Sequence, residues 1–528
     1  MKNRFTLKKS VLAGAALCVA LAVILTGCST ANQSKPSPSS ATLTVASTTA
    51  PNSLDPAQSA NGAPSRWFID PAYATLLTLN AKTGVPEAGL AEKWGYVGSN
   101  NDNFQFQLRK GLKFADGTPL QADQVIASFK YYLSTGAGPT KAYFAGWTFK
   151  AVNDLTVQIS TTTPVPIIPE LLTPDYLIGD IISPAGLTKP SVLAAGSYGA
   201  GAYVLDQSQT VAGDHYTYIP NKNYYDTANV HYAKIVAKVI PNLTQQVQAL
   251  KTGQIQVMLA DPTVASTLTG GSIGTATRMV SWTGMYLFDR DGTIVPALKS
   301  LKVRQALNYA IDRNPTVAAV YGKYGEPTSQ EALPGSDANG YDAGLDKTYG
   351  YDLAKAKSLL AEAGYADGFS MPVFYESYVP AEAKLAQVLA SQLSKIGVTV
   401  QLKGESNFSS WVSDLFSKQF AGTVFNGGSG GGAYQSVQWF LTNGALNPFK
   451  STTPSVETAY QALSEAKAGT PQQTTAARQV MKALVESADA VVVARTESIF
   501  AYNKTKVSGV NYIGATGVLT TITDWVSK

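Results

Sequence analysis

The group with the clearest potential for chemistry is a serine set among glycines. The stretch Gly427-Gly428-Ser429-Gly430-Gly431 matches the G-x-S-x-G pattern, in which a serine hydroxyl attacks an acyl carbon. That reaction needs a histidine base that follows the serine in the chain, yet both histidines, His215 and His231, precede Ser429. A serine hydrolase is therefore only a remote alternative, and we expect that the protein is not an enzyme.

The sequence also gives little support for a phosphate-binding loop or a metal site. The residues after the glycines are Ala433-Tyr434-Gln435, where a phosphate-binding loop needs Lys followed by Ser or Thr. Two histidines that lie well apart in the chain are a weak basis for a metal site. We expect neither a cofactor nor a metal ion.

Cys28 is a candidate for covalent modification. Four basic residues near the amino terminus precede an uncharged apolar run from Val11 to Leu25, and Leu25-Thr26-Gly27-Cys28 follows. This order is typical of an export signal, and the run is shorter than the ~20 residues that a spanning helix needs. Small residues before a cysteine resemble the lipobox of bacterial lipoproteins. We expect residues 1–27 to be a lipoprotein signal peptide and Cys28 to be the lipidated first residue of an extracytoplasmic protein anchored to the cell membrane.

The remaining cysteine and the next segment agree with this interpretation. Cys18 lies within the predicted signal peptide, so the mature chain would have no partner for a disulfide. A diacylglycerol on Cys28 would supply two acyl chains, which is enough for stable anchoring. Residues 28–40 lack aromatic and branched aliphatic side chains and are predicted to be a flexible linker.

The net charge of the chain does not indicate any particular class of partner. The formal net charge of the whole chain is +5, and removal of the four basic residues of the signal peptide leaves about +1. No dense run of Lys and Arg follows residue 28, whereas a nucleic-acid-binding domain shows a concentrated basic face. We expect no nucleic-acid partner.

Strand and helix patterns alternate along the mature chain. Phe104, Phe106 and Leu108 alternate with polar residues as in a half-buried strand. The spacing of apolar residues predicts an amphipathic helix between Lys302 and Arg313 that is closed by Asn314-Pro315. Further helices are predicted after the turn at Asp116-Gly117-Thr118-Pro119, from the N-cap Asp352 to Gly364, from Leu385 to Gly397, and from Thr244 to Leu250, with strands after the last two. Such units predict α/β domains.

Four ordered blocks of sequence are similar to one known family. They cover 85–125, 199–226, 301–313 and 351–402, and include LKVRQALNYAIDR at Leu301–Arg313. In this order they resemble the extracellular solute-binding proteins of family 5, the peptide, oligopeptide and nickel type. The resemblance implies a two-lobe, periplasmic-binding-protein-like fold of class II, in its large form with an inserted subdomain. Lobe I would comprise 41–285 and 490–528, with the inserted subdomain at about 81–197, and lobe II would comprise 286–489.

The resemblance also implies a function. Such proteins capture a ligand between their lobes by hinge closure and deliver it to the permease subunits of an ABC importer, which has cytoplasmic ATPases. The expected ligand is a peptide or another small organic solute, and the protein is expected to be a monomer. A ligand-presenting surface receptor or chaperone on the same fold is the alternative, because capture and closure would look the same in the sequence.

One departure from the family's pattern concerns the ligand. Peptide-binding members anchor the ligand's amino group with an aspartate in a stretch that corresponds to Phe420–Trp439, which has no acidic residue here. A buried ammonium without a carboxylate would be costly. Either another acid such as Glu376 or Asp289 substitutes, or the ligand is not an ordinary peptide, and glycines would suit a neutral or anionic compound.

The candidate binding residues are chosen by their position relative to the family's pattern and to the predicted strands. For the second-lobe wall they are Phe425, Asn426, Gly427, Gly428 and Ser429. Six aromatic residues are further candidates: Trp282, Tyr286, Tyr375, Tyr378, Tyr434 and Trp439. For the first lobe they are Asn52, Ser53, Arg66 and Trp67, which follow the opening strand. Core packing is the competing explanation for each aromatic residue, because most Trp and Tyr side chains are simply buried.

Overall fold

The computed structural model describes residues 40–59, 64–98, 100–136, 143–335, 339–428, 432–444, 446–513 and 519–528. The predicted signal peptide, Cys28, nearly all of the predicted linker and Ser429 lie outside these residues. Within them, no helix combines the length and the apolar character that crossing a membrane requires.

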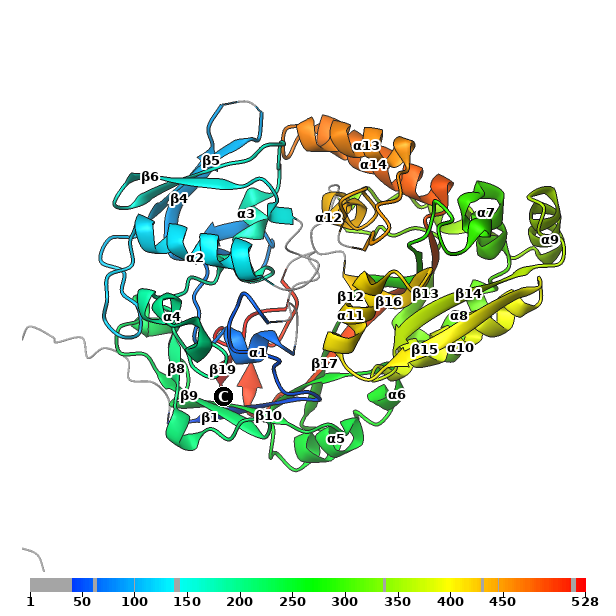
Figure 1. The fold of residues 1–528 in the computed structure, drawn as a ribbon. Helices are drawn as coiled ribbons and strands as arrows, with labels where there is room; N and C mark the ends of the chain where they lie inside the picture. The colour runs from blue at the N-terminus through cyan, green and yellow to red at the C-terminus, as the bar shows by residue number, and fades with distance from the viewer. Residues whose placement is uncertain are drawn as a thin grey trace, which may run out of the picture. The chain divides into compact units, whose positions relative to one another are not determined.

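A mixed sheet of eleven strands organises the chain (Figure 1). Its strand order is β15-β14-β16-β12-β17-β11-β1-β10-β9-β8, and β13 pairs with β17 beside this path. The strands are β1 (Thr42–Ser47), β8 (Tyr203–Leu205), β9 (His215–Pro220), β10 (Lys234–Val239), β11 (Val257–Ala260), β12 (Ile273–Leu287), β13 (Gly325–Pro327), β14 (Phe369–Glu376), β15 (Val398–Glu405), β16 (Gly422–Gly428) and β17 (Ala490–Asn503). Pairing is parallel around β1 and β14 and antiparallel elsewhere.

Three smaller sheets are formed by other segments of the described chain. A four-stranded sheet of order β4-β5-β7-β6 and two hairpin-like pairs, β2-β3 and β18-β19, are antiparallel. Their bounds are β2 (Leu77–Leu79), β3 (Pro86–Ala88), β4 (Ala91–Tyr96), β5 (Asn103–Leu108), β6 (Thr148–Asn153), β7 (Thr156–Ser160), β18 (Val507–Ser508) and β19 (Val526–Ser527). The four-stranded sheet falls within the region predicted as an inserted subdomain.

Helices pack on these sheets and on one another, as with α2 beside β6 and α13 beside α14 (Figure 1). The helices are α1 (Arg66–Ile69), α2 (Ala122–Thr135), α3 (Ile168–Leu171), α4 (Pro184–Thr188), α5 (Leu243–Lys251), α6 (Pro262–Ala265), α7 (Leu301–Tyr309), α8 (Arg313–Val320), α9 (Leu353–Glu362), α10 (Pro380–Ser394), α11 (Phe408–Ser417), α12 (Gly432–Gln438), α13 (Pro454–Glu465) and α14 (Pro471–Ser487). The predicted α/β class is confirmed.

Two long strands, β12 and β17, connect the two ends of the large sheet. Beyond their pairing with each other, the carboxyl end of β17 pairs with β11, while the carboxyl end of β12 pairs with β16. The ladder between them shifts register at Val280, between Met279 and Ser281. Such a bulge bends a strand and increases its twist, so the direction of the sheet changes where its two ends meet.

Most of the predicted local elements are confirmed. Asp352 caps α9 by accepting a hydrogen bond from the Lys355 N–H at 2.9 Å, and Gly364 and Gly397 have the positive φ angles of 86° and 83° that helix C-caps favour. In β5 the buried residues alternate with half-buried ones, as predicted.

One predicted helix boundary is wrong. The helix expected between Lys302 and Arg313 ends at Tyr309, and Asn314-Pro315 do not close it but lie in the first turn of α8. A proline is tolerated there because the first N–H groups of a helix have no partner within the helix.

Gly284 allows β12 and β17 to approach each other closely. A Cβ atom at this position would lie 2.2 Å from the Val491 carbonyl oxygen and 2.9 Å from the Val492 Cα. Both are main-chain atoms, so a larger residue can be accommodated only by moving a strand.

We therefore expect Gly284→Ala to lower the free energy of unfolding by ~1–3 kcal/mol, the usual cost of overpacking. Urea denaturation of the purified protein measures this. Gly271→Ala is the matched control, because no atom lies within 4 Å of the added Cβ, and it should change stability by no more than ~0.5 kcal/mol. Equal effects of the two substitutions would contradict the close approach.

Candidate ligand-binding site

One cavity has a volume of about 940 Å³. Its walls come from distant parts of the sequence: the loops around α1, the start of α6, the bulge of β12, the turn between β14 and α10, helix α11, the end of β16 and the middle of β17. This volume is typical of a site that encloses a small organic molecule.

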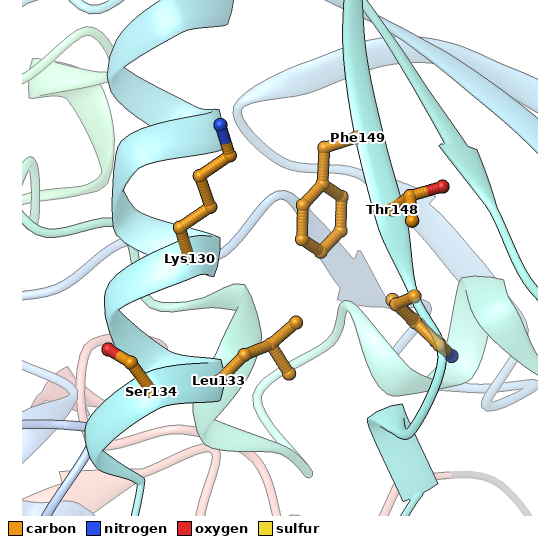
Figure 2. Close-up of a pocket in the computed structure, with 6 residues that line it drawn as sticks. Lys130, Leu133, Ser134, Thr148 and Phe149 are labelled. Atoms are coloured by element: carbon orange, nitrogen blue, oxygen red, sulfur yellow. The ribbon is translucent and has the colours of Figure 1, made fainter.

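A smaller cavity of about 450 Å³ lies between α2 and β6 (Figure 2). Leu133 and Phe149 point into the gap between the helix and the strand, and Lys130 is the one charged group among its lining residues. It is formed by one helix and one neighbouring strand and lacks converging polar groups. The 940 Å³ cavity is the better candidate.

Seven of the predicted binding residues line the larger cavity: Asn52, Arg66, Trp67, Tyr378, Phe425, Asn426 and Trp439. Six others lie elsewhere among the described residues: Ser53, Trp282, Tyr286, Tyr375, Gly427 and Tyr434. Gly428 is the last residue of β16. Ser429 falls outside the described residues. The end of β16 and the loop that leads into α1 are therefore both at the cavity, as the sequence predicts.

Several predicted aromatic residues are packed in the core. The rings of Trp282 and Tyr286 are stacked with centroids 4.4 Å apart, and the two residues are 0% and 1% exposed. Gly427 serves this packing, because a Cβ there would lie 2.1 Å from the Tyr286 hydroxyl and 2.4 Å from the Trp439 ring. This glycine makes room for aromatic side chains, whereas the sequence predicted close approach of a ligand.

The end of β16 presents both an aromatic and a polar group to the cavity. Phe425 stacks on Trp411, with 4.8 Å between the ring centroids. The Asn426 side-chain amide donates a hydrogen bond of 3.0 Å to the Thr496 hydroxyl, which lies 2.8 Å from the Ser281 hydroxyl. These polar groups come from β16, β17 and β12, so the bulge in β12 lies directly at the site.

Arg66 is held by acidic neighbours. Its Nη1 donates to Asp180 at 2.5 Å and its Nη2 lies 2.5 Å from the Asp70 carboxylate. Burial raises the pKa of Asp70 to about 7, although the positive charge of Arg66 opposes the shift. A guanidinium whose Nη1 and Nη2 are both paired with carboxylates is a structural cation, and Nε is its one nitrogen without a hydrogen-bond partner.

Asp289 and Glu376 are the two acids predicted to replace the family's aspartate. Asp289 is fully buried and accepts hydrogen bonds from the N–H groups of Thr293, Ile294 and Val295 at 2.6–2.8 Å, so it holds a loop away from the cavity. Glu376, in contrast, lines the cavity at the end of β14. Of the two predicted substitutes, the structure places only Glu376 at the site.

A second carboxyl group next to Glu376 was not predicted. Glu382 lies in the first turn of α10, is 3% exposed and lines the cavity. Burial raises the pKa of Glu376, and burial followed by the charge of Glu376 raises that of Glu382 well above its usual range. The sequence did contain a signal, because Glu382 is three residues before Leu385 and four before Ala386, on the apolar face of its helix.

The histidines and other metal-binding residue types do not form a site in the described part of the chain. His215 lies 2.6 Å from Asp214 at the surface, and neither histidine lines the cavity. No group of three or more His, Cys, Asp or Glu residues that could hold a metal ion occurs among the described residues.

We expect Arg66→Met to lower the free energy of unfolding by ~3–5 kcal/mol at pH 8, because it leaves the buried charge of Asp180 without a partner. Lys302→Met is the control, since Lys302 and Glu362 are half exposed and 2.9 Å apart, and it should cost less than ~1 kcal/mol. Urea denaturation of both variants gives the comparison. A small effect of Arg66→Met would indicate that the guanidinium is not committed to Asp180.

Comparison with known proteins identifies relatives with different ligands. The chain is 26% identical over 345 residues to the "Probable peptide ABC transporter periplasmic-binding protein y4tO" of Sinorhizobium fredii, covering 62% of this chain and 64% of that protein. It is 27% identical over 400 residues to heme-binding protein A of Haemophilus influenzae, covering 70% and 71%. The matched regions thus span about two thirds of these curated relatives.

The fold is shared with solved structures. The periplasmic binding protein AgaA of A. tumefaciens R10, in complex with agropinic acid, aligns over 90% of this chain and 95% of its own, with a TM-score of 0.80 at 20% identity. The predicted two-lobe, periplasmic-binding-protein-like class is confirmed by this likeness. The family model for the middle region of bacterial extracellular solute-binding proteins, family 5, matches residues 85–448, which is more than half of the chain. The chain belongs to the bacterial extracellular solute-binding proteins of family 5.

Proposed function

We propose that this protein is the lipid-anchored substrate-binding component of an ABC importer, and that it captures a peptide-like or other small organic solute. The observation that carries the proposal is the 940 Å³ cavity, whose walls come from both predicted lobes. The names of its relatives point to peptide in one case and heme in another. The family alone therefore does not choose the ligand.

The capture step would depend on the two predicted lobes. Residues from 41–285 and 490–528, such as Arg66 and Thr496, face residues from 286–489, such as Trp411 and Asn426, around the cavity. The boundary predicted at 285/286 lies inside β12, and the one at 489/490 directly precedes β17. We place the hinge in these two strands near the bulge at Val280, since hinge motion is concentrated in a few residues that connect rigid parts.

Contacts between the predicted inserted subdomain and the predicted second lobe would be gained on closure. The Trp439 indole N–H donates to the Tyr143 hydroxyl at 2.5 Å, and the Asn101 side-chain amide donates to the Ala466 carbonyl at 3.2 Å. Because Trp439 also lines the cavity, a ligand that contacts it would stabilise the same closed state. A ligand shifts such an equilibrium only by its extra contacts in one state.

The remaining parts of the proposal concern where and how the protein works. Lipid on Cys28 would hold it at the outer face of the cell membrane as a monomer beside its permease. We propose that it does not act as an enzyme, in keeping with a family of solute-binding proteins and with the positions of both histidines away from the cavity.

We expect the purified protein to retain a small molecule that mass spectrometry identifies after denaturation. Re-addition of that compound to the stripped protein should reduce its radius of gyration in small-angle X-ray scattering, because closure brings the lobes together. Heat-denatured protein carried through the same extraction is the control for compounds that bind non-specifically. A retained compound that leaves the radius of gyration unchanged would contradict the closing mechanism.

We expect Cys28→Ala to move the protein from the membrane fraction to the soluble fraction, since both acyl chains would be lost. Cys18→Ala is the matched control, because this cysteine lies inside the predicted signal peptide, and it should leave the protein at the membrane. Immunoblots of fractionated cells distinguish the two. Membrane retention of the Cys28→Ala variant would contradict lipid anchoring at this residue.

A further inference from the structure

We propose that Glu376 and Glu382 form a subsite that binds a basic nitrogen of the ligand, either an ammonium or a guanidinium group. This inference rests on the proposed solute-binding function and deepens it by naming the charge of the ligand. It follows the alternative in which Glu376 replaces the family's aspartate, and it departs from the neutral or anionic compound that the glycine-rich stretch would suit.

The turn between β14 and α10 places both carboxyl groups on one wall of the cavity. Glu376 is the last residue of β14, Glu382 follows in the first turn of α10, and every residue from Tyr378 to Glu382 also lines the cavity. The two carboxyl groups are neighbours, and the charge of Glu376 contributes to raising the pKa of Glu382. The Tyr378 hydroxyl donates to Oε1 of Glu376 and fixes that side chain.

Glu382 has hydrogen-bonding capacity that the protein does not use. Its Oε2 is buried and has no hydrogen-bond partner, although the residue lines a cavity that can hold a ligand. Most buried polar atoms in proteins are paired, and an unpaired one calls for an explanation. A donor supplied by the ligand would satisfy this oxygen.

The charge of the cavity favours a cation. Among its described lining residues, Arg66 is the one basic side chain, and it is paired with Asp70 and Asp180. Acidic lining residues outnumber it: Asp70, Asp175, Asp261, Glu376, Glu382 and Glu497. A ligand that carried a net negative charge would meet unfavourable potential, whereas an ammonium or guanidinium group would meet charge-assisted hydrogen bonds.

Other titratable groups around Glu382 do not supply a cation either. Tyr286, Tyr321 and Tyr378 face it from β12, from the end of α8 and from the turn before α10, and Asp261 faces it from the start of α6. The main chain of Asn426 on β16 hydrogen-bonds its carboxyl group. On β15, which also packs against α10, Lys403 is 3.0 Å from Glu405 and 2.7 Å from Asp414, and is therefore already engaged.

A proton takes the place of the cation when the subsite is empty. Two buried carboxyl groups in contact cannot both be charged without a large penalty, so they share one proton, and the pKa of Glu382 is raised accordingly. An ammonium group bound between the two carboxyl groups would favour the charged form of both and displace the shared proton, so that the two carboxylates and the ammonium together carry a net charge of −1. By linkage, affinity for a basic ligand should rise as the pH rises towards the pKa of Glu382 and should weaken on acidification.

The test uses the full-length protein, stripped of retained compounds, and two sets of probes. The first set contains a library of tripeptides with free amino termini, together with arginine and spermidine, and the second contains the same tripeptides with acetylated amino termini. Binding is measured by thermal shift and then by calorimetry at pH 6, in two buffers with different ionisation heats. The variants are Glu376→Gln and Glu382→Gln. Glu331→Gln is the control, because Glu331 is equally buried, has a pKa raised to about 8 by burial, and does not line the cavity.

We expect members of the first set to bind and their acetylated counterparts to bind at least roughly tenfold less tightly, as expected for loss of a charge-assisted hydrogen bond. Both cavity variants should weaken the basic ligand by a similar factor, with Glu331→Gln unchanged. Wild-type protein should release about one proton per ligand, and Glu382→Gln close to none. Urea midpoints verify that each variant is folded.

Three results would overturn the subsite. They are equal binding of free and acetylated probes, unchanged affinity and proton release in both cavity variants, or no binding by any basic probe. If a neutral or acidic compound retained by the protein still binds and compacts it, only the subsite is wrong and solute capture stands. If nothing is retained and no probe of either set binds, the proposed function fails with it.

Discussion

The continuous hydrogen-bonded ladder between β12 and β17 is the constraint on which the rest of the structure depends. These two strands are paired along almost their whole length and are shared by both ends of the large sheet. The strands that border the cavity are therefore positioned by this one pair, either directly or through β11 and β16. Gly284 keeps this pair close, and the bulge at Val280 bends it at the cavity.

Burial of charge is the second constraint, and it acts differently on the two sides of the cavity. Around Arg66 the acidic groups are compensated by a guanidinium inside the protein. Around Glu382 no cation from the described residues compensates the two carboxyl groups, and a shared proton does so. The first arrangement has its own cation, although Nε of Arg66 has no hydrogen-bond partner, whereas the second has no cation and leaves Oε2 of Glu382 unpaired. Selectivity for the solute's charge would reside in that difference.

Local sequence patterns predicted the elements well because their causes are local. Alternation in β5, the cap at Asp352 and the glycines after α9 and α10 each depend on a few neighbouring residues. The break between α7 and α8 was placed wrongly because a proline ends one helix and begins another equally well. The boundary is set by tertiary packing that a window of sequence does not contain.

The site was predictable only where position along the chain determines it. The end of β16 was chosen because its stretch corresponds to the one that anchors the ligand in peptide-binding family members, and the segment at α1 because it follows the opening strand. Which aromatic residue faces the cavity could not be predicted. Trp282 and Trp439 are distinguished by their tertiary neighbours and not by the composition of the sequence around them. Likewise Asp289 and Glu376 were equal candidates until their hydrogen-bond partners were known.

The aromatic packing around Gly427 has a consequence for how this binding site can diversify. Phe425 and Trp439 line the cavity, yet their rings are also in contact with the core residues Trp411 and Tyr286. Substitutions on that wall would also disturb the packing of the core, so few of them are compatible with a stable fold. The turn that carries Tyr378 is more exposed, so new ligand preferences can arise there during evolution at a lower cost to the fold.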